Sequence, residues 1–245
     1  MAKELSVNRL TPVSGLGAVL FAHFGARFGN AGGGVPSPFE AGGAEIAGYY
    51  SAHSTFTAVS SYLYALSVVC LVVFAAGLWH RLSTAGAPDA RPWAMVGLTG
   101  TAVYSVLVLL LALIQLSLVG LSERDGSSPE MVAGLAVVWA FSAALLVPGS
   151  VPLLLGFGMA GRRGGLISGL LTTFAFVGVA LGLLPPPEVA GPSSPPLAGL
   201  LFVLSELQPW FMVFWLLGVS FVIHRSERRP KGHPEPAPAS GDAAG

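Results

Sequence analysis

The stretch that decides the fold is Ala102-Val-Tyr-Ser-Val-Leu-Val-Leu-Leu-Leu-Ala-Leu-Ile-Gln-Leu-Ser-Leu-Val-Gly-Leu121, which contains no charged residue. About 20 predominantly apolar residues in a helix are long enough to cross the hydrocarbon core of a bilayer. The stretch therefore predicts a membrane-spanning helix, and comparable apolar runs recur along the chain.

The composition of the whole chain agrees with this interpretation. The 245 residues are 53% hydrophobic and only 10% charged, and the mean hydropathy is +0.72. A soluble domain carries about 25% charged residues, so the composition excludes an ordinary soluble enzyme and a disordered chain. The 12 basic and 12 acidic residues balance and form no basic stripe, which argues against nucleic acid as a partner. The single cysteine, Cys70, excludes a disulfide framework.

Six apolar runs predict an all-α polytopic membrane protein with six transmembrane helices. Each run is much longer than the ~10 residues of a barrel strand, which excludes a barrel. Within a transmembrane domain over residues 10–224, the expected spans cover about residues 10–29, 55–79, 93–121, 131–160, 165–184 and 197–224. Residues 1–9 are the expected cytoplasmic N-terminus, and residues 225–245, rich in Pro, Ala and Gly, predict a disordered cytoplasmic tail.

Two of these spans leave alternatives open. The first, interrupted by His23 and Arg27, also resembles a cleaved secretory signal, although its glycines and Pro12 dilute the apolar core of such a signal and favour retention. The fourth contains Val147-Pro-Gly-Ser-Val-Pro152, where two prolines and a glycine must kink or break a helix. This segment is either a hinge within one long span or the point at which the span ends early.

The basic residues predict the orientation of the spans. Arg27 and Arg124 fall on one side of the six-span arrangement, and the other 10 of the 12 Lys and Arg residues fall on the opposite side. Cytoplasmic loops carry the excess of Lys and Arg, so we expect both termini in the cytoplasm. The residues expected on that side are Lys3, Arg9, Arg81, Arg91, Arg162, Arg163, Arg225, Arg228, Arg229 and Lys231.

The residue that points most directly to a function is Glu206, in Leu204-Ser-Glu-Leu-Gln-Pro-Trp210 of the sixth span. A carboxyl group within the bilayer is costly and usually faces a bundle interior or a water-filled cavity. Pro209 cannot donate a backbone hydrogen bond to the carbonyl of Ser205, so a kink there would leave a free carbonyl beside the carboxyl. These residues predict a proton or cation site. The alternative is a protonated glutamate that holds helices together.

Polar residues of other spans extend this candidate site. One face of the second span carries Thr57, Ser60, Ser61, Tyr64 and Ser67. One face of the third span carries Thr101, Tyr104, Ser105 and Gln115. Judged by depth in the membrane, an outward-facing ion or ligand site is expected from His23, Ser60, Tyr64, Gln115, Ser205 and Glu206. The alternative is a set of separate interhelical hydrogen bonds, each worth roughly 1 kcal/mol.

The segment Glu45-Ile-Ala-Gly-Tyr-Tyr-Ser-Ala-His53 predicts an interfacial helix over about residues 44–54, with its tyrosines at the headgroup level. Glu45 and His53 lie two helical turns apart, about 12 Å, and therefore cannot bind one metal ion. The pattern E-I-x-x-Y-Y-x-x-H, after a weak first span and before a long second one, resembles uncharacterised six-span integral membrane proteins of high-GC bacteria. The resemblance implies a bacterial cytoplasmic membrane and transfers no activity.

Motifs for catalysis and cofactors are not evident. Gly156-Phe-Gly-Met-Ala-Gly161 matches a dinucleotide-binding pattern, but no strand precedes it and no acid follows about twenty residues later. Without a nucleophile–base pair or a metal-ligand set, we expect no catalytic residue, no cofactor and no metal, and an enzyme ranks below other classes. Two small-xxx-small pairs, Gly165 with Gly169 and Gly178 with Gly182, are typical of close helix packing or of a homo-oligomer.

The sequence leaves two classes of function. The first is a structural or regulatory component of the membrane, in which the polar residues serve helix packing. The second is a small proton- or cation-linked carrier, or a ligand-binding protein, that uses Glu206 in an outward-facing polar cavity. The lipid bilayer is the expected partner of both. A closed, filled bundle would favour the first class, and a cavity the second.

Overall fold

The structure is a computed structural model that describes residues 7–30, 34–84, 87–124, 126–184 and 195–228, with the side chains of 7–9, 195–198, 202, 205–206 and 227–228 left out. Within these ranges every regular element is an α-helix, which confirms the all-α class. The helices are α1 (Val7–Gly29), α2 (Gly43–Ala52), α3 (Ser54–Thr84), α4 (Ala90–Ser122), α5 (Pro129–Ala144), α6 (Leu146–Gly149), α7 (Val151–Arg163), α8 (Gly169–Gly182) and α10 (Pro195–Arg228).

Four helical segments are long and apolar enough to cross a membrane, by length and composition. They are Ser54–Thr84, Ala90–Ser122, Pro129–Arg163 and Leu207–Ser226. By this criterion the chain is a multi-pass membrane protein. The shorter apolar helix α8 has 14 residues, about 21 Å by helix rise, which is less than the ~30 Å hydrocarbon core. The first expected span, α1, is also not among the four segments, so six spans stay a prediction, as do the cytoplasmic termini.

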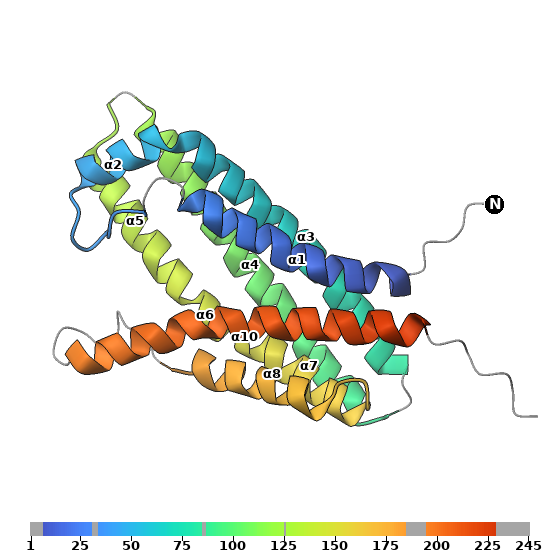
Figure 1. The fold of residues 1–245 in the computed structure, drawn as a ribbon. Coiled ribbons are helices and arrows are strands. Elements are labelled where there is room, and N and C mark those ends of the chain that lie inside the picture. Colours follow the sequence, from blue (N-terminus) through green and yellow to red (C-terminus); the bar gives the residue numbers. More distant parts are fainter. Residues whose placement is uncertain (1–6, 31–33, 85–86, 125, 185–194, 229–245) are drawn as a thin grey trace, which may run out of the picture.

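The long helices close into a ring in which each packs on the next (Figure 1). α1 packs on α3, α3 on α4, α4 on α7, α7 on α8 and α8 on α10, and α10 returns to α1. α1 and α3 run side by side in opposite directions, and α10 crosses the other helices obliquely (Figure 1). The start of α1 and the end of α10 lie at the same end of the molecule.

A stripe of small residues attaches α1 to its neighbours. A side chain at Gly15 would meet Ser220 and Phe74, and one at Gly77 of α3 would meet Thr11, so the helix backbones approach closely. In lipid, small residues favour such packing because there is no hydrophobic drive between helices. The stripe follows a spacing of four and three residues and consists of Thr11, Gly15, Ala18, Ala22, Gly25 and Gly29.

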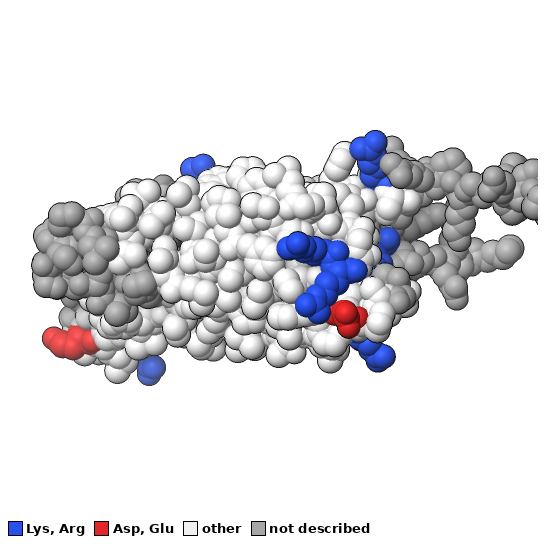
Figure 2. Space-filling model, turned by 90° about the horizontal axis from the view of Figure 1, so that it is seen from below, with Lys and Arg blue, Asp and Glu red and all other residues white. Residues whose placement is uncertain are grey.

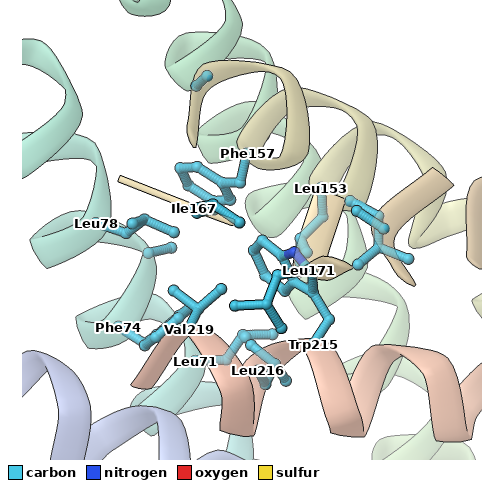
Figure 3. Packing of buried hydrophobic residues seen from close by; sticks show 14 of the residues in the cluster. Leu71, Phe74, Leu78, Leu153, Phe157, Ile167, Leu171, Trp215, Leu216 and Val219 are labelled. Carbon is cyan, nitrogen blue, oxygen red and sulfur yellow. The ribbon is translucent and has the colours of Figure 1, made fainter. Parts of the chain in front are cut away.

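The main core lies inside the ring and is centred on Trp215 of α10, which is fully buried. Its ring stacks on Phe157 of α7 and meets Phe74 of α3 edge to face, both at 6.5 Å between ring centroids. Figure 3 shows these rings among leucine and valine side chains from α3, α7, α8 and α10, together with Ile167 from the α7–α8 connection. One aromatic residue thus joins helices that are far apart in the sequence.

The expected fourth span is interrupted twice but does not end at Pro148. α5, α6 and α7 follow one another with only Leu145 and Ser150 between them, and both residues keep helical dihedral angles. The backbone N–H of Ser150 still donates to the Leu146 carbonyl at 3.1 Å. Proline has no N–H to donate, which explains why the regular helix is lost around these positions.

The segment from Glu45 to Ala52 lies in α2, with His53 as the C-cap, and a second core buries one side of this helix. Ile46 and Tyr50 of α2 are 0% and 1% exposed, and they pack against α4 and α5. Tyr49 donates a hydrogen bond to the Gly29 carbonyl at 3.2 Å and stacks on His53 at 4.6 Å. α2 therefore fastens the end of α1 to the α4–α5 end of the molecule.

Charged side chains separate between the two ends of the molecule. Those at the end where α3, α7 and α10 finish are Arg81, Asp89, Arg91, Arg162, Arg163 and Arg225. Those at the opposite end are Arg27, Glu40, Glu45, Glu123, Arg124 and Glu130. Figure 2 shows most of the visible basic groups toward one end of this face and a belt without charged side chains between the ends, and the side chains exposed along the helices there are largely apolar.

Candidate functional site

A cavity of about 160 Å³ lies among α1, α3, α4, α6 and α10. Its walls are mostly aliphatic, from residues such as Ala18, Val68, Leu111 and Leu216. An apolar protein cavity of about 150 Å³ is large enough to bind benzene. The space is therefore of a size to hold a small organic group.

The cavity lies near the middle of the helices that enclose it. Val68 is 14 residues from the start of α3, about 21 Å along a helix of 31 residues. Val108 is similarly central in α4. Binding sites of many transport proteins lie at such mid-membrane positions, next to interrupted helices.

Two tyrosines supply most of the polar character of the wall. Tyr64 of α3 and Tyr104 of α4 both line the cavity. Neither phenol oxygen has a hydrogen-bond partner within the part of the chain that the structure describes. Ser67, the other polar lining residue, donates its hydroxyl to the Tyr64 carbonyl at 2.7 Å and is already occupied. The tyrosine hydroxyls are the groups free to bind a ligand.

Two proline-interrupted helices meet beside this cavity. Leu146, in the interruption between α5 and α7, and Pro209, inside α10, both contribute to the wall. Next to them, the side-chain amide of Gln208 donates to the Ser150 hydroxyl at 2.5 Å. Both residues are buried, with exposures of 3% and 0%. This hydrogen bond fixes one interrupted helix to the other.

The structure places the described members of the expected site at separate points. Ser60 donates its hydroxyl to the Gly25 carbonyl at 2.7 Å, which joins α3 to α1. Gln115 accepts from Ser61 at 3.3 Å, which joins α4 to α3. His23 is exposed on α1, where its ring meets Phe24 edge to face at 6.2 Å. Of this set only Tyr64 lines the cavity.

The remaining two members, Ser205 and Glu206, have their backbone in α10. Their side chains lie outside the described part of the structure. Their place in the chain is one turn before Pro209, which lines the cavity. The role of the carboxyl group therefore stays a prediction.

Sequence reasoning missed three residues of this region as site members. Tyr104 was visible in the polar face of the third span, since 11 residues separate it from Gln115 and place both on one side of a helix. Ser150 lies between the two prolines of the fourth span, and Gln208 precedes the proline of the sixth. Polar residues beside helix-breaking prolines were the signal for this pair.

The chemistry of the described wall suits an uncharged ligand. No Asp, Glu, Lys, Arg or His is among the described residues that line the cavity. Two phenol groups can donate hydrogen bonds to an acceptor, and the aliphatic surface suits a hydrocarbon or aromatic body. Among the described residues, no group of three or more His, Cys, Asp and Glu side chains is placed to hold a metal ion.

Comparison with known proteins gives no relative from which an activity can be transferred. The resemblance that rests on Glu45 to His53 thus stays a prediction. No family model, no curated protein and no solved structure matches the chain.

Proposed function

We propose that this chain is a ligand-binding membrane protein that holds a small, uncharged, mainly apolar molecule in the cavity between α1, α3, α4, α6 and α10. In this proposal the protein crosses a bacterial cytoplasmic membrane six times, with both termini on the basic, cytoplasmic side. The ligand reaches the cavity from the bilayer or from the outer side, and its polar group accepts hydrogen bonds from Tyr64 and Tyr104.

The observation that carries the proposal is the pair of free tyrosine hydroxyls in an otherwise apolar cavity. Both tyrosines are half-buried at the cavity wall, where a hydroxyl gains stability from a hydrogen-bond partner. Phenylalanine would pack the same helices without a hydroxyl group that needs a partner. Ligand binding gives the two hydroxyls partners and therefore explains why they are tyrosines.

The test compares two fluorinated probes of nearly equal size, 4-fluorophenol and fluorobenzene, by ¹⁹F NMR titration of the protein in lipid nanodiscs. We expect both probes to enter the cavity and 4-fluorophenol to bind more tightly, because its oxygen accepts from the tyrosines. Tyr104→Phe should reduce the preference for 4-fluorophenol about fivefold, which corresponds to one hydrogen bond of about 1 kcal/mol. Val213→Phe, which fills the cavity, should weaken the binding of both probes.

The matched control is Tyr62→Phe on α3, since the Tyr62 side chain is 65% exposed and lies outside the cavity. It should leave both affinities unchanged. If the ratio of the two probe affinities is the same in the parent and in Tyr104→Phe, the hydroxyls do not recognise a ligand and the proposal fails.

A structural role is the second candidate, and the engaged polar contacts favour it. Ser60 with Gly25, Ser61 with Gln115 and Gln208 with Ser150 are all interhelical hydrogen bonds. Under this alternative the cavity is a packing defect and Glu206 is a protonated link between helices. Glu206→Gln keeps the shape of the side chain but cannot titrate. In a proton-linked carrier, probe binding would depend on pH between pH 5 and 8 in the parent and would lose this dependence in Glu206→Gln. With a structural glutamate, the pH dependence of probe binding would be the same in the parent and in the variant.

A further inference from the structure

A shallow groove lies on the outer surface of the ring, at the contact between α4 and α7. Its volume is about 310 Å³, and Met95, Val96, Thr99, Gly100, Val103 and Pro152 line it. Met95, Val96 and Val103 are 40–48% exposed, so the groove faces the surroundings of the ring. Within the apolar belt these surroundings are lipid chains.

The groove owes its shape to glycines where α4 and α7 cross. A side chain added at Gly156 would meet the backbone of Gly97 and Trp93, and one added at Gly100 would meet the backbone of Pro152 and Leu153. The two helices therefore touch through their backbones. The larger side chains on either side of this contact form the walls of the groove. Along α4 the lining extends from Met95 to Val103, about 12 Å by helix rise, which matches part of an acyl chain.

Two arginines lie at the basic end of the molecule, where α4 begins and α7 ends. Arg91 precedes Met95, Thr99 and Val103 at intervals of four residues along α4, so it continues the row that lines the groove. On α7, Arg163 follows Pro152 by 11 residues, about three turns, and shares its side of the helix. Both arginines are exposed.

The arginine of α7 is held toward α4 by an aromatic ring. The guanidinium carbon of Arg163 lies 5.6 Å from the centre of the Trp93 ring. Tryptophan is typical of the membrane interface, the depth at which phospholipid headgroups lie. Neither Arg91 nor Arg163 forms an ion pair with an acidic side chain of the described residues, and Arg162 beside them is exposed as well. Three positive charges are thus available at headgroup depth.

We propose that the α4–α7 groove binds one anionic phospholipid, with an acyl chain along Met95, Thr99 and Val103 and the phosphate between Arg91 and Arg163. The guanidinium group suits a phosphate because it donates two parallel hydrogen bonds. Basic pockets between helices on the cytoplasmic side are typical sites for anionic headgroups. The occupant is a phospholipid because charge and a chain-sized apolar groove occur on one continuous surface.

The test uses native mass spectrometry of the full-length protein in detergent, titrated with phosphatidylglycerol or with phosphatidylcholine of the same acyl chains. We expect a first phosphatidylglycerol to bind at least tenfold more tightly than phosphatidylcholine. The double variant Arg91→Gln/Arg163→Gln should abolish this preference. Val103→Trp fills the groove from an exposed position and leaves the arginines in place. It should weaken the binding of the first phosphatidylglycerol about tenfold.

The matched control is Arg124→Gln/Arg225→Gln, which also removes two exposed charges but none from the groove. It should keep the preference for phosphatidylglycerol. Equal binding of the two lipids to the parent, or an equal loss in the control, would overturn the proposal. Inorganic phosphate at millimolar concentration should not compete with the lipid. If phosphate displaces the lipid, and Val103→Trp binds phosphatidylglycerol as tightly as the parent does, the arginines bind phosphate alone and the groove is not a lipid site.

Discussion

At the scale of single residues, glycines decide how closely α4 and α7 approach. A methyl group at Gly156 would meet backbone atoms of Gly97 and the Trp93 carbonyl, and backbone cannot move aside as a flexible side chain can. Gly134 of α5, by contrast, has open space around it. Replacing each glycine with alanine therefore compares the same substitution at a site of close helix contact and at a site without one.

We expect Gly156→Ala to destabilise the protein by about 1–3 kcal/mol, because overpacking forces the helices apart. Gly134→Ala should be neutral or stabilising by up to ~1 kcal/mol, since alanine is the better helix former. Reversible unfolding in mixed detergent micelles measures both free energies. Equal effects of the two substitutions would mean that the α4–α7 contact is looser than the structure has it.

Two adjacent tyrosines of α2 differ in their use of the hydroxyl group. Tyr49 donates to the Gly29 carbonyl, whereas the Tyr50 hydroxyl is buried without a partner among the described residues. Tyr49→Phe should therefore cost about 1 kcal/mol, and Tyr50→Phe should cost nothing or stabilise slightly. Thermal unfolding of the two variants at pH 8 gives the comparison. A larger loss for Tyr50→Phe would contradict the contacts of α2.

The same buried tyrosine predicts a dependence of stability on pH. Burial raises the pKa of Tyr50 above its ordinary value near 10, and the nearby Tyr49 raises it further. Above pH ~10 the unfolded chain loses this proton while the folded protein keeps it, so stability is complete below pH ~10 and falls above it. We expect the midpoint of thermal unfolding to fall less between pH 8 and 11 in Tyr50→Phe than in the parent. Identical falls would show that Tyr50 does not contribute.

At the scale of helices, the interrupted segments α5–α7 and α10 are joined by Gln208 and Ser150. Ser150→Ala leaves the buried amide of Gln208 without its acceptor and should cost about 1–3 kcal/mol. Gln208→Leu removes the amide, so adding Ser150→Ala to it should cost much less than the same change in the parent. A double-mutant cycle on the free energy of unfolding measures this coupling, expected near 1 kcal/mol. Simple additivity would mean that the two helices are not linked through this contact.

At the scale of the whole molecule, the separation of charge between the two ends supports a fixed orientation in the membrane. The described basic residues are concentrated at the end where α3, α7 and α10 finish, as expected of a cytoplasmic face. Of the six expected spans, the first and the fifth, which correspond to α1 and α8, are not among the four candidate segments, and the 14 residues of α8 are too short to cross alone. The prediction of six spans requires both to cross, α8 together with neighbouring residues.

Labelling with a membrane-impermeant thiol reagent in intact cells tests the topology. In a Cys70→Ser background, we expect Ser127→Cys and Ser193→Cys to react from outside and Ser168→Cys to stay protected until the cells are lysed. A reporter fused at Gly245 should be active only in the cytoplasm, because ten of the 12 Lys and Arg residues are expected on that side. Protection of Ser193→Cys in intact cells would show that α8 does not cross.

Much of the fold was predictable from local pattern, and the candidate site was not. The polar face of the second span is buried as its spacing predicts, with Thr57, Ser60, Ser61 and Ser67 all turned inward. Which of these residues would line a cavity was beyond the sequence, because that depends on how far apart the facing helices lie. His23 was expected at the site by its depth, yet it is exposed on α1, since depth along a helix does not fix rotation about its axis.

The sequence by itself determined the all-α class and the apolar helices of membrane-spanning length, because a bilayer sets run length and polarity directly. Only the tertiary structure decided that α1 packs on α3 through small residues, that Gln208 reaches Ser150, and that Tyr64 and Tyr104 share one cavity. In lipid the hydrophobic effect does not drive helices together, so the amino-acid composition of the helices does not predict which of them pack on one another. The arrangement depends instead on the shapes of particular surfaces, and shape exists only once the helices are placed together.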